Sequence, residues 1–269
     1  MSDLDALERQ LLGYGRVLLG YSGGVDSALV AVAARRVLGP DDLLAVIGRS
    51  PSYPEAQWRA AVDLARQRDI PLLEVDTAEL ADPRYTANPT NRCYFCKTEL
   101  WSTLGRIARE RGLSVVIDGT NADDLREHRP GLRAAAEQGV RSPLAELGWT
   151  KAKVREVSRT LGLAAWNAPA APCLSSRVAY GLEITPARLR QIERAEAILR
   201  DLGVTGDLRV RHHGDRVRIE VLAVEMDRVR AAWAVVRAEF AALGLDRVEL
   251  DPAGYRRGGL LPLAPSVPA

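Results

Sequence analysis

Two groups of residues in this chain have the types and spacing to do chemistry. The first is the hexapeptide Ser22-Gly23-Gly24-Val25-Asp26-Ser27. The second is the pair Cys93 and Cys96, with a third cysteine, Cys173, much later in the chain. A glycine-rich turn with hydroxyl side chains suits phosphate oxygens, while thiolates act as nucleophiles and metal ligands. The residue types therefore predict phosphate chemistry and thiol or metal chemistry in one chain.

The hexapeptide lies between a strand-like apolar run over residues 16–21 and a helical pattern that starts at Val25. The hydroxyls of Ser22 and Ser27, with the N–H groups of the helix start, can donate to phosphate oxygens. Asp26 would repel phosphate unless a Mg²⁺ ion bridged the two, so we interpret it as a magnesium ligand. The alternative is an ordinary glycine-rich turn in which Asp26 and Ser27 cap the helix.

Three cysteines cannot build a disulfide framework, because one is always left over. Cys93 and Cys96 form a C-x-x-C near the start of a predicted helix, where thiolates are stabilised. Three thiolates are one ligand short of a tetrahedral zinc site and of a fully ligated 4Fe–4S cluster. A cluster held by three cysteines leaves one iron with an open position, which can hold an extra sulfide and suits sulfur delivery. Three unrelated cysteines, a buried pair and one loop thiol, are the alternative.

The elements that must position these residues alternate along the first two-thirds of the chain. The predicted strands cover residues 16–21, 43–47, 71–75 and 114–117, and the predicted helices cover residues 25–38, 55–68, 91 to beyond 104, and 151–161. This alternation predicts right-handed crossovers and an α/β fold with a doubly wound parallel sheet. Ligands of such sheets bind beyond the carboxyl ends of the strands. The hexapeptide, residues 50–52 and residues 118–121 lie there, so we count Ser50 among the cofactor-binding candidates.

The pattern changes after Gly181. A helix is predicted from Thr185, as the N-cap, to about Leu202, with Pro186 at its first position. Strands over residues 208–212, 216–221 and 247–250 and a helix over residues 227–243 complete a small α+β unit. We therefore divide the chain into an α/β domain over residues 1–181 that contains the hexapeptide, a substrate-binding or oligomerisation domain over residues 182–260, and a loose tail over residues 261–269.

Composition narrows the class of protein. The chain is 47% hydrophobic and 27% charged, with a formal net charge of +2. This balance excludes a disordered charged tail and argues against binding long nucleic acid by bulk charge. No apolar run approaches the ~20 residues of a membrane span, and residues 1–5 lack the basic-then-apolar layout of a signal peptide. We therefore expect a cytoplasmic protein without a membrane partner.

Lysine is rare in this chain. Of 37 basic side chains only three are lysines, namely Lys97, Lys151 and Lys153. A lysine near a site in such a chain marks a position where arginine does not serve. Lys97 directly follows Cys96 and is therefore a candidate.

The hexapeptide resembles the PP-loop of ATP pyrophosphatases rather than a Walker sequence. That resemblance implies that ATP is split between its α and β phosphates. A substrate oxygen becomes adenylated, pyrophosphate leaves, and a nucleophile then displaces AMP. A wider resemblance to the LarE family of ATP-dependent sulfur transferases extends from Ser22 to about Val221. The further motifs that carry it are NRCYFCK (91–97), DGTNADD (118–124), RPG (129–131), SPL (142–144), PCLSSR (172–177) and RVR (209–211).

The LarE resemblance implies ATP and Mg²⁺ as cofactors and a role in making the nickel-pincer nucleotide cofactor of lactate racemase. The small-molecule partner would be pyridinium-3,5-biscarboxylic acid mononucleotide, whose carboxylates would be adenylated and converted to thiocarboxylates. Cys173 matches the family's sulfur-bearing cysteine. Because Cys93 and Cys96 are also present, the chain resembles members that hold a 4Fe–4S cluster. In the alternative, Cys173 gives up its own sulfur and ends as dehydroalanine. The source that replenishes the sulfur stays unknown.

The remaining candidates are charged or hydroxyl side chains. Lys97 would contact a phosphate or the developing charge at the adenylating carboxylate, or be a solvated helix-face charge. Arg177, next to the cysteine loop, would stabilise thiolate and substrate, or form a surface ion pair. Arg209 and Arg211 alternate along a strand, face one side, and would clamp the nucleotide phosphate. The resemblance adds Ser176, Glu196 and Glu220 as substrate-binding positions.

Two rival functions stay open. A PP-loop tRNA thiolation enzyme combines similar motifs, but the near-neutral charge and the lack of a basic, aromatic-interleaved segment argue against a nucleic-acid partner. A non-catalytic nucleotide- or cluster-binding sensor would bind ATP without exchanging pyrophosphate into it. The family resemblance also implies a homo-oligomer.

Overall fold

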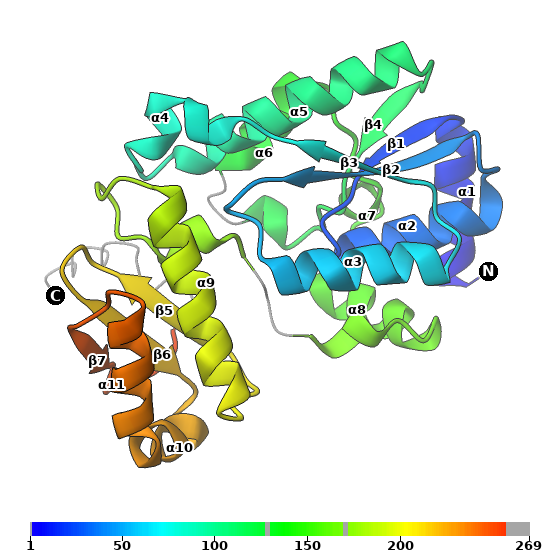
Figure 1. The fold of residues 1–269 in the computed structure, drawn as a ribbon. Helices are drawn as coiled ribbons and strands as arrows, with labels where there is room; N and C mark the ends of the chain where they lie inside the picture. The colour runs from blue at the N-terminus through cyan, green and yellow to red at the C-terminus, as the bar shows by residue number, and fades with distance from the viewer. Residues whose placement is uncertain (1, 127–129, 169–171, 257–269) are drawn as a thin grey trace, which may run out of the picture. The chain divides into compact units, whose positions relative to one another are not determined.

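The computed structural model describes residues 2–126, 130–168 and 172–256, which form two compact units (Figure 1). The first unit contains residues 2–85, 90–126 and 130–168, and the second contains residues 86–89 and 172–256. Arg129 of the RPG motif and the predicted tail over residues 261–269 lie outside the described residues.

The first unit alternates strands and helices, as the sequence predicts. Its strands are β1 (Val17–Gly20), β2 (Leu43–Arg49), β3 (Leu72–Asp76) and β4 (Val115–Ile117). Its helices are α1 (Asp3–Tyr14), α2 (Val25–Val37), α3 (Glu55–Gln67), α4 (Pro83–Thr86), α5 (Arg92–Glu110), α6 (Pro130–Glu137), α7 (Pro143–Glu146) and α8 (Lys151–Thr160), with short 3₁₀ turns η1 (Glu79–Ala81), η2 (Asp124–Arg126) and η3 (Ala164–Asn167).

The four strands form a parallel sheet in the order β3-β2-β1-β4. The central strand β1 pairs Val17 with Leu43 of β2 on one side and with Val115 of β4 on the other. Helices cover both faces of this sheet, with α2 and α3 on one side and α5 and α6 on the other (Figure 1). The predicted doubly wound α/β fold is therefore confirmed.

Alternate residues of β1 serve two separate cores. Val17 and Leu19 pack with α1, α2 and α3 on one face, whereas Leu18 packs with Trp101 and Leu104 of α5 on the other. All three β1 residues are fully buried. This two-sided burial explains why the strand reads as a continuous apolar run in the sequence.

The second unit is a small α+β structure. It contains η4 (Leu174–Arg177), α9 (Pro186–Asp201), β5 (Leu208–His212), β6 (Val217–Val221), η5 (Ala223–Glu225), α10 (Met226–Ala231), α11 (Trp233–Ala242) and β7 (Val248–Leu250). In its sheet β6 pairs antiparallel with β5 and parallel with β7. Thr185 caps α9 by accepting from the Arg188 N–H, with Pro186 at the first helical position as predicted. The single helix expected over residues 227–243 is divided at Ala232 into α10 and α11.

The second unit begins at residue 172 and takes in residues 86–89, both placed with the first domain by the sequence. The Asn88 side-chain amide donates to the carbonyls of Val178, Ala179 and Leu182 at 3.3, 2.8 and 3.0 Å. The Ile184 N–H donates to the Thr86 carbonyl at 2.8 Å. These bonds join segments about ninety residues apart, which no local sequence signal reveals.

Within the described residues, no helix combines the length and the apolar character that crossing a bilayer requires.

Candidate functional site

The hexapeptide follows the end of β1 and turns into α2. Gly24 is the N-cap of α2 and provides no side chain to cap the helix. The first N–H groups of a helix lack intrahelical acceptors, and together with the helix dipole they favour an anion. The fold therefore presents residues 22–27 as an anion-binding turn at the carboxyl end of the central strand.

The loop is held by its own hydroxyls and by α3. The Ser27 hydroxyl accepts from the Ser22 N–H at 3.2 Å and donates to the Gly24 carbonyl at 3.2 Å. From α3 and the residues before it, the Tyr53 hydroxyl and the Gln57 amide donate to the Ser22 carbonyl at 2.8 and 2.7 Å. Burial raises the pKa of Tyr53, so this hydroxyl keeps its proton and acts as a donor.

Gly23 must be glycine for two physical reasons. Its φ of +66° is a conformation that other residues rarely adopt. A Cβ atom at this position would lie 2.4 Å from the Ala61 Cβ on α3. The close approach of the loop to α3 thus depends on the missing side chain.

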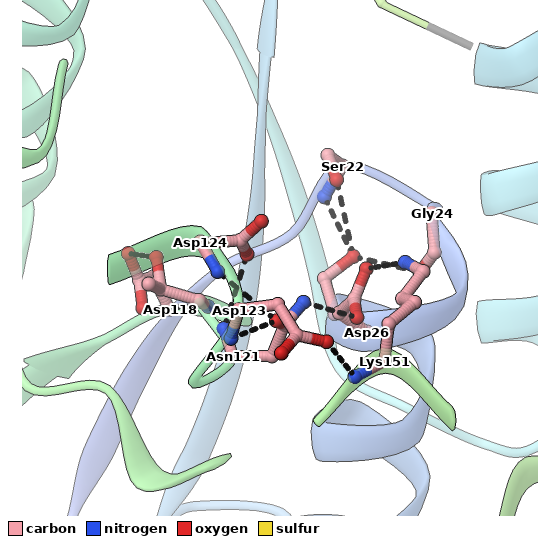
Figure 2. A network of polar contacts seen from close by, with 10 residues as sticks. Ser22, Gly24, Asp26, Asp118, Asn121, Asp123, Asp124 and Lys151 are labelled. Carbon is pink, nitrogen blue, oxygen red and sulfur yellow. Dashed lines mark hydrogen bonds and ion pairs between the residues drawn. The ribbon is translucent and has the colours of Figure 1, made fainter. Parts of the chain in front are cut away.

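Asp26, the predicted magnesium ligand, lies in the first turn of α2 with both carboxylate oxygens engaged (Figure 2). Its Oδ1 accepts from the Asn121 side-chain amide at 3.1 Å, and its Oδ2 forms an ion pair with the Lys151 ammonium. The Asp26 side chain is 20% exposed and that of Lys151 is 38% exposed. A partly exposed carboxylate beside the loop is a suitable donor for Mg²⁺, and its role as a ligand remains a prediction.

The loop after β4 contacts Asp26 through the side chain of Asn121 (Figure 2). The Asp118 carboxylate accepts from the Thr120 N–H and hydroxyl at 3.0 and 2.7 Å, and from the Ser142 hydroxyl at 2.7 Å. Asn121 is 2% exposed, and its side-chain carbonyl accepts from the Asp123 N–H at 3.0 Å. These hydrogen bonds therefore order the loop that follows β4.

Gly119 brings this loop against the hexapeptide. A Cβ on Gly119 would lie 2.6 Å from the Ser27 backbone nitrogen and 3.0 Å from the Asp26 carbonyl carbon. Both atoms belong to backbone at the start of α2, which cannot move aside as a side chain can. Glycine at position 119 is what allows the two loops to touch.

Lys151 is the residue of this site that the sequence reasoning missed. It is the first residue of α8, and its own N–H donates to the Asp123 carboxylate at 2.8 Å. Its side chain reaches Asp26, 125 positions earlier. The one available signal was the scarcity of lysine, which had directed attention to Lys97.

Ser50, the other cofactor-binding candidate, follows β2 and is engaged within its own loop. Its hydroxyl lies 2.8 Å from the Ser52 hydroxyl and accepts from the Ser52 N–H at 3.2 Å. Ser52 in turn donates to the buried Glu79 carboxylate at 3.1 Å. The sequence correctly places Ser50 at a strand end, and its contact with a cofactor stays a prediction.

Cys93 lies in the first turn of α5 and is exposed, and Cys96 follows at the start of the second turn and is half-buried. Residues three apart on a helix share a face, and a helix start stabilises thiolates. The pair therefore fits two ligands of a metal or cluster. Lys97 follows on α5 with its ammonium 5.2 Å from the centre of the Trp101 ring, and a Cβ on Gly131 of α6 would lie 2.9 Å from the Lys97 Cγ.

Cys173 belongs to the second unit, whereas Cys93 and Cys96 belong to the first. Among the described residues, no group of three or more His, Cys, Asp or Glu side chains is gathered so that it could hold a metal ion. The proposed three-cysteine cluster site therefore stays a prediction from the sequence.

Arg177 holds the segment that carries Cys173. Its guanidinium pairs with both oxygens of Glu196, with Nε–Oε1 at 2.9 Å and Nη2–Oε2 at 3.0 Å. Its Nη1 donates to the carbonyls of Pro172 and Cys173 at 2.5 and 3.1 Å and lies 3.1 Å from the Ser176 hydroxyl. The Arg177 side chain is 4% exposed and that of Glu196 is 16% exposed, so the alternative of a surface ion pair is wrong for Arg177, because its guanidinium is buried.

Arg211 forms a second buried pair. Its Nε donates to Glu220 Oε2 at 3.0 Å, and its Nη1 donates to the Ser176 carbonyl at 2.9 Å. The side chains of Arg211 and Glu220 are 6% and 4% exposed. Glu220, expected to bind substrate, is thus bound to an arginine of the neighbouring strand, as Glu196 is bound to Arg177.

Arg209 lies two residues before Arg211 on β5 and is equally buried. Its guanidinium stacks 5.1 Å from the centre of the Tyr255 ring and donates to the Leu208 carbonyl at 2.5 Å. Burial and then the nearby Arg177 charge lower the pKa of Arg209. An anion bound beside Arg209 would offset both effects, which suits the expected phosphate clamp.

The chain is similar in sequence to several known proteins. The profile of the NAD synthase family matches residues 7–90, which include the hexapeptide. An uncharacterised protein of Synechocystis sp. is 46% identical over 94% of both chains. A pyridinium-3,5-bisthiocarboxylic acid mononucleotide synthase of Lactiplantibacillus plantarum is 35% identical over 90% of this chain and 88% of its own.

A more distant relative is one component of the glutamine-hydrolysing GMP synthase of Methanopyrus kandleri, which is 25% identical over 72% of this chain and 65% of its own. The matches support an ATP-dependent PP-loop enzyme and thereby disfavour the non-catalytic sensor.

Proposed function

Because this chain belongs to the LarE family of sulfur transferases, we propose that it makes thiocarboxylates on a pyridinium mononucleotide at the expense of ATP. The substrate is pyridinium-3,5-biscarboxylic acid mononucleotide, and the product is a precursor of the nickel-pincer nucleotide cofactor. One observation carries the ATP-dependent half of this proposal. The turn over residues 22–27 presents uncapped helix N–H groups beside an acidic and a basic side chain, Asp26 and Lys151.

In the first half-reaction a substrate carboxylate oxygen attacks the α-phosphorus of ATP, and pyrophosphate leaves. The N–H groups at the start of α2 and the hydroxyls of Ser22 and Ser27 bind phosphate oxygens. Asp26 would hold Mg²⁺, which supplies charge neutralisation for the phosphates. Lys151 reaches the same turn, so its ammonium can stabilise the negative charge that develops on the departing pyrophosphate.

In the second half-reaction sulfur replaces AMP on the activated carboxyl carbon. Cys173 is the thiol of the second unit and carries the sulfur, either as a ligand of a cluster or as the donor itself. Cys93, Cys96 and Cys173 would hold a 4Fe–4S cluster, whose open iron position can carry an extra sulfide. The position of Cys93 and Cys96 three residues apart near the start of α5 supports the assignment of two of these ligands.

Substrate binding belongs to the second unit in this proposal. Ser176, Arg209 and Arg211 provide hydroxyl and guanidinium donors for the nucleotide phosphate. The burial of both arginines and the lowered pKa of Arg209 support an anion there. Glu196 and Glu220 hold arginines in place, so their predicted direct contact with substrate receives no support from the contacts.

The test is an exchange assay followed by product analysis. Labelled pyrophosphate should enter ATP only when the biscarboxylate mononucleotide is present, and mass spectrometry should find oxygen replaced by sulfur in the product. Exchange stimulated by tRNA instead of the mononucleotide would favour the thiolation rival. Absence of exchange with either substrate would refute the proposed adenylation.

The origin of the sulfur needs a separate experiment. Anaerobically purified protein should contain about four irons and at least four acid-labile sulfides per chain, and Cys93→Ala should lose them. A protein without iron after anaerobic reconstitution, together with dehydroalanine at position 173 after one turnover, would assign the sulfur to Cys173. Cys173→Ala should abolish transfer by either route.

A further inference from the structure

The segment before η4 is held from one side by a single guanidinium. Cys173 is the N-cap of this four-residue 3₁₀ helix, and its carbonyl accepts from the Ser176 N–H at 3.0 Å and from Arg177 Nη1 at 3.1 Å. The carbonyl of Pro172 accepts from the same Nη1. The backbone on both sides of the Cys173 Cα is therefore tied to Arg177.

Arg177 has little left to offer a substrate. Four of its five N–H donors have assigned acceptors: Nε and Nη2 each donate to Glu196, and Nη1 donates to the Pro172 and Cys173 carbonyls. The residue is 3% exposed. The contacts of Arg177 therefore do not favour direct contact with a substrate. Arg177 nevertheless lies next to the segment that carries Cys173, as the sequence predicts.

Glu196 also contacts β5, the strand that carries Arg209 and Arg211. Its Oε1 accepts from Arg177 Nε and also from the Val210 N–H of β5 at 3.0 Å. Val210 lies between Arg209 and Arg211. One carboxylate on α9 therefore joins the thiol segment, through Arg177, to the backbone of the strand that carries both arginines.

We propose that Glu196 is a positioning residue which, through Arg177, fixes the Cys173 thiol relative to the arginines of β5. The Glu196–Arg177 pair fixes a relative position rather than binding a ligand, because a bidentate arginine–carboxylate pair sets orientation as well as distance. A thiol that must react with a carbon activated on a bound nucleotide has to be held in a defined position relative to that nucleotide. This inference rests on the proposed function for its catalytic meaning.

The experiment compares variants in the full chain after removal of iron with a chelator. Glu196→Gln places an amide donor against the guanidinium and breaks the pair, while Glu196→Asp keeps the charge on a shorter stem. Arg177→Lys cannot bridge Glu196 and both carbonyls at once. Glu193→Gln makes the same charge change on the same helix and is the matched control.

The first readout is the alkylation rate of each cysteine by N-ethylmaleimide, resolved by peptide mass spectrometry. In Glu196→Gln and Arg177→Lys, Cys173 should react about threefold faster or more, because its segment opens more often. Cys93, in the other unit, is the internal reference and should not change. Glu196→Asp should restore part of the protection, and the double variant should add nothing to Arg177→Lys.

The second readout is thiocarboxylate formation in the iron-loaded protein. Glu196→Gln should lower kcat about tenfold or more with an unchanged KM for the mononucleotide, while pyrophosphate exchange persists. A raised KM with unchanged kcat would make Glu196 and Arg177 substrate contacts and overturn the inference, as would unchanged Cys173 alkylation. If the native chain made no thiocarboxylate, the proposed function would fail while the alkylation result still judged the positioning role.

Discussion

At the scale of single residues, an ion pair between distant positions lies beside the turn over residues 22–27. Asp26 and Lys151 are each partly exposed, so their pairing contributes modestly to stability. The pair instead keeps an ammonium beside the turn where phosphates are expected. Lys153 lies on the same helix, but its ammonium pairs with Asp3 and Glu156 at 2.7 and 3.1 Å, away from the turn.

Lys151→Ala should lower substrate-dependent pyrophosphate exchange about a hundredfold, since it removes a charge from the developing anion. Lys153→Ala, the matched control, should leave exchange unchanged. The free energy of unfolding of both variants should lie within about 1 kcal/mol of that of the native protein. Equal exchange rates in the two variants would remove Lys151 from the proposed mechanism.

Gly119→Ala should weaken ATP binding and destabilise the first unit by about 1–3 kcal/mol. The new Cβ would lie 2.6 Å from the Ser27 nitrogen, so the two loops must separate. Gly13→Ala is the control, because a Cβ at Gly13 meets nothing within 4 Å. Urea unfolding and ATP titration measure the two effects, and native-like values for Gly119→Ala would contradict the close contact.

At the scale of elements, the four-residue segment Thr86–Pro89, which starts at the last residue of α4, is part of the second unit. Asn88 in this segment is fully buried, has a φ of +54°, and donates to three carbonyls of the segment that follows η4. Buried carbonyls that lose their donor carry a desolvation penalty. Asn88 therefore stabilises residues 178–182, which lie between Cys173 and α9.

Asn88→Ala should lower the free energy of unfolding of the second unit by about 2–3 kcal/mol. Asn91→Ala is the control, since Asn91 is exposed and its side chain makes no capping hydrogen bond with α5. Denaturant unfolding combined with limited proteolysis near residues 178–184 measures the effect. A loss as small as that of Asn91→Ala would show that the three hydrogen bonds contribute little.

At the scale of the whole molecule, the described residues of the two units form separate hydrophobic cores, two in the first unit and one in the second. The second unit also contains a buried histidine. His212 is 4% exposed, and its Nδ1 accepts from the Gly214 N–H at 3.2 Å. Burial, followed by the charges of Arg188 and His213, lowers the pKa of His212 to about 4 from 6.5. The folded state therefore binds this proton less readily than the unfolded state.

Stability should rise with pH across the window from about 4 to 6.5, because the unfolded chain binds more protons there. On acidification from pH 6.5 to 4, His212 should account for a loss of up to about 3 kcal/mol. His212→Asn offers an acceptor of similar reach without titrating. The difference between the unfolding free energies of the native and variant proteins, measured across this window, isolates the histidine. Parallel pH profiles would contradict the assignment.

The sequence by itself determined the features that depend on neighbouring residues. Periodicity gave the strands and most helices, so β1, α2 and the Thr185 cap of α9 are found as predicted. The strand ends placed the turn over residues 22–27, Ser50 and Asp118 at one edge of the sheet. Helix α1 was missed, although Ser2 and Asp5 form a capping box at its start, a signal that could have revealed it.

Only the tertiary structure decided which charges meet. Asp26 pairs with Lys151, Arg177 with Glu196 and Arg211 with Glu220, and Asn88 binds carbonyls about ninety positions away. With many arginines in the chain, sequence patterns cannot choose among partners, because pairing follows distance in space and burial. The residue types therefore indicated the chemistry, while the fold brought Lys151 to the turn over residues 22–27 and paired Glu196 and Glu220 with arginines.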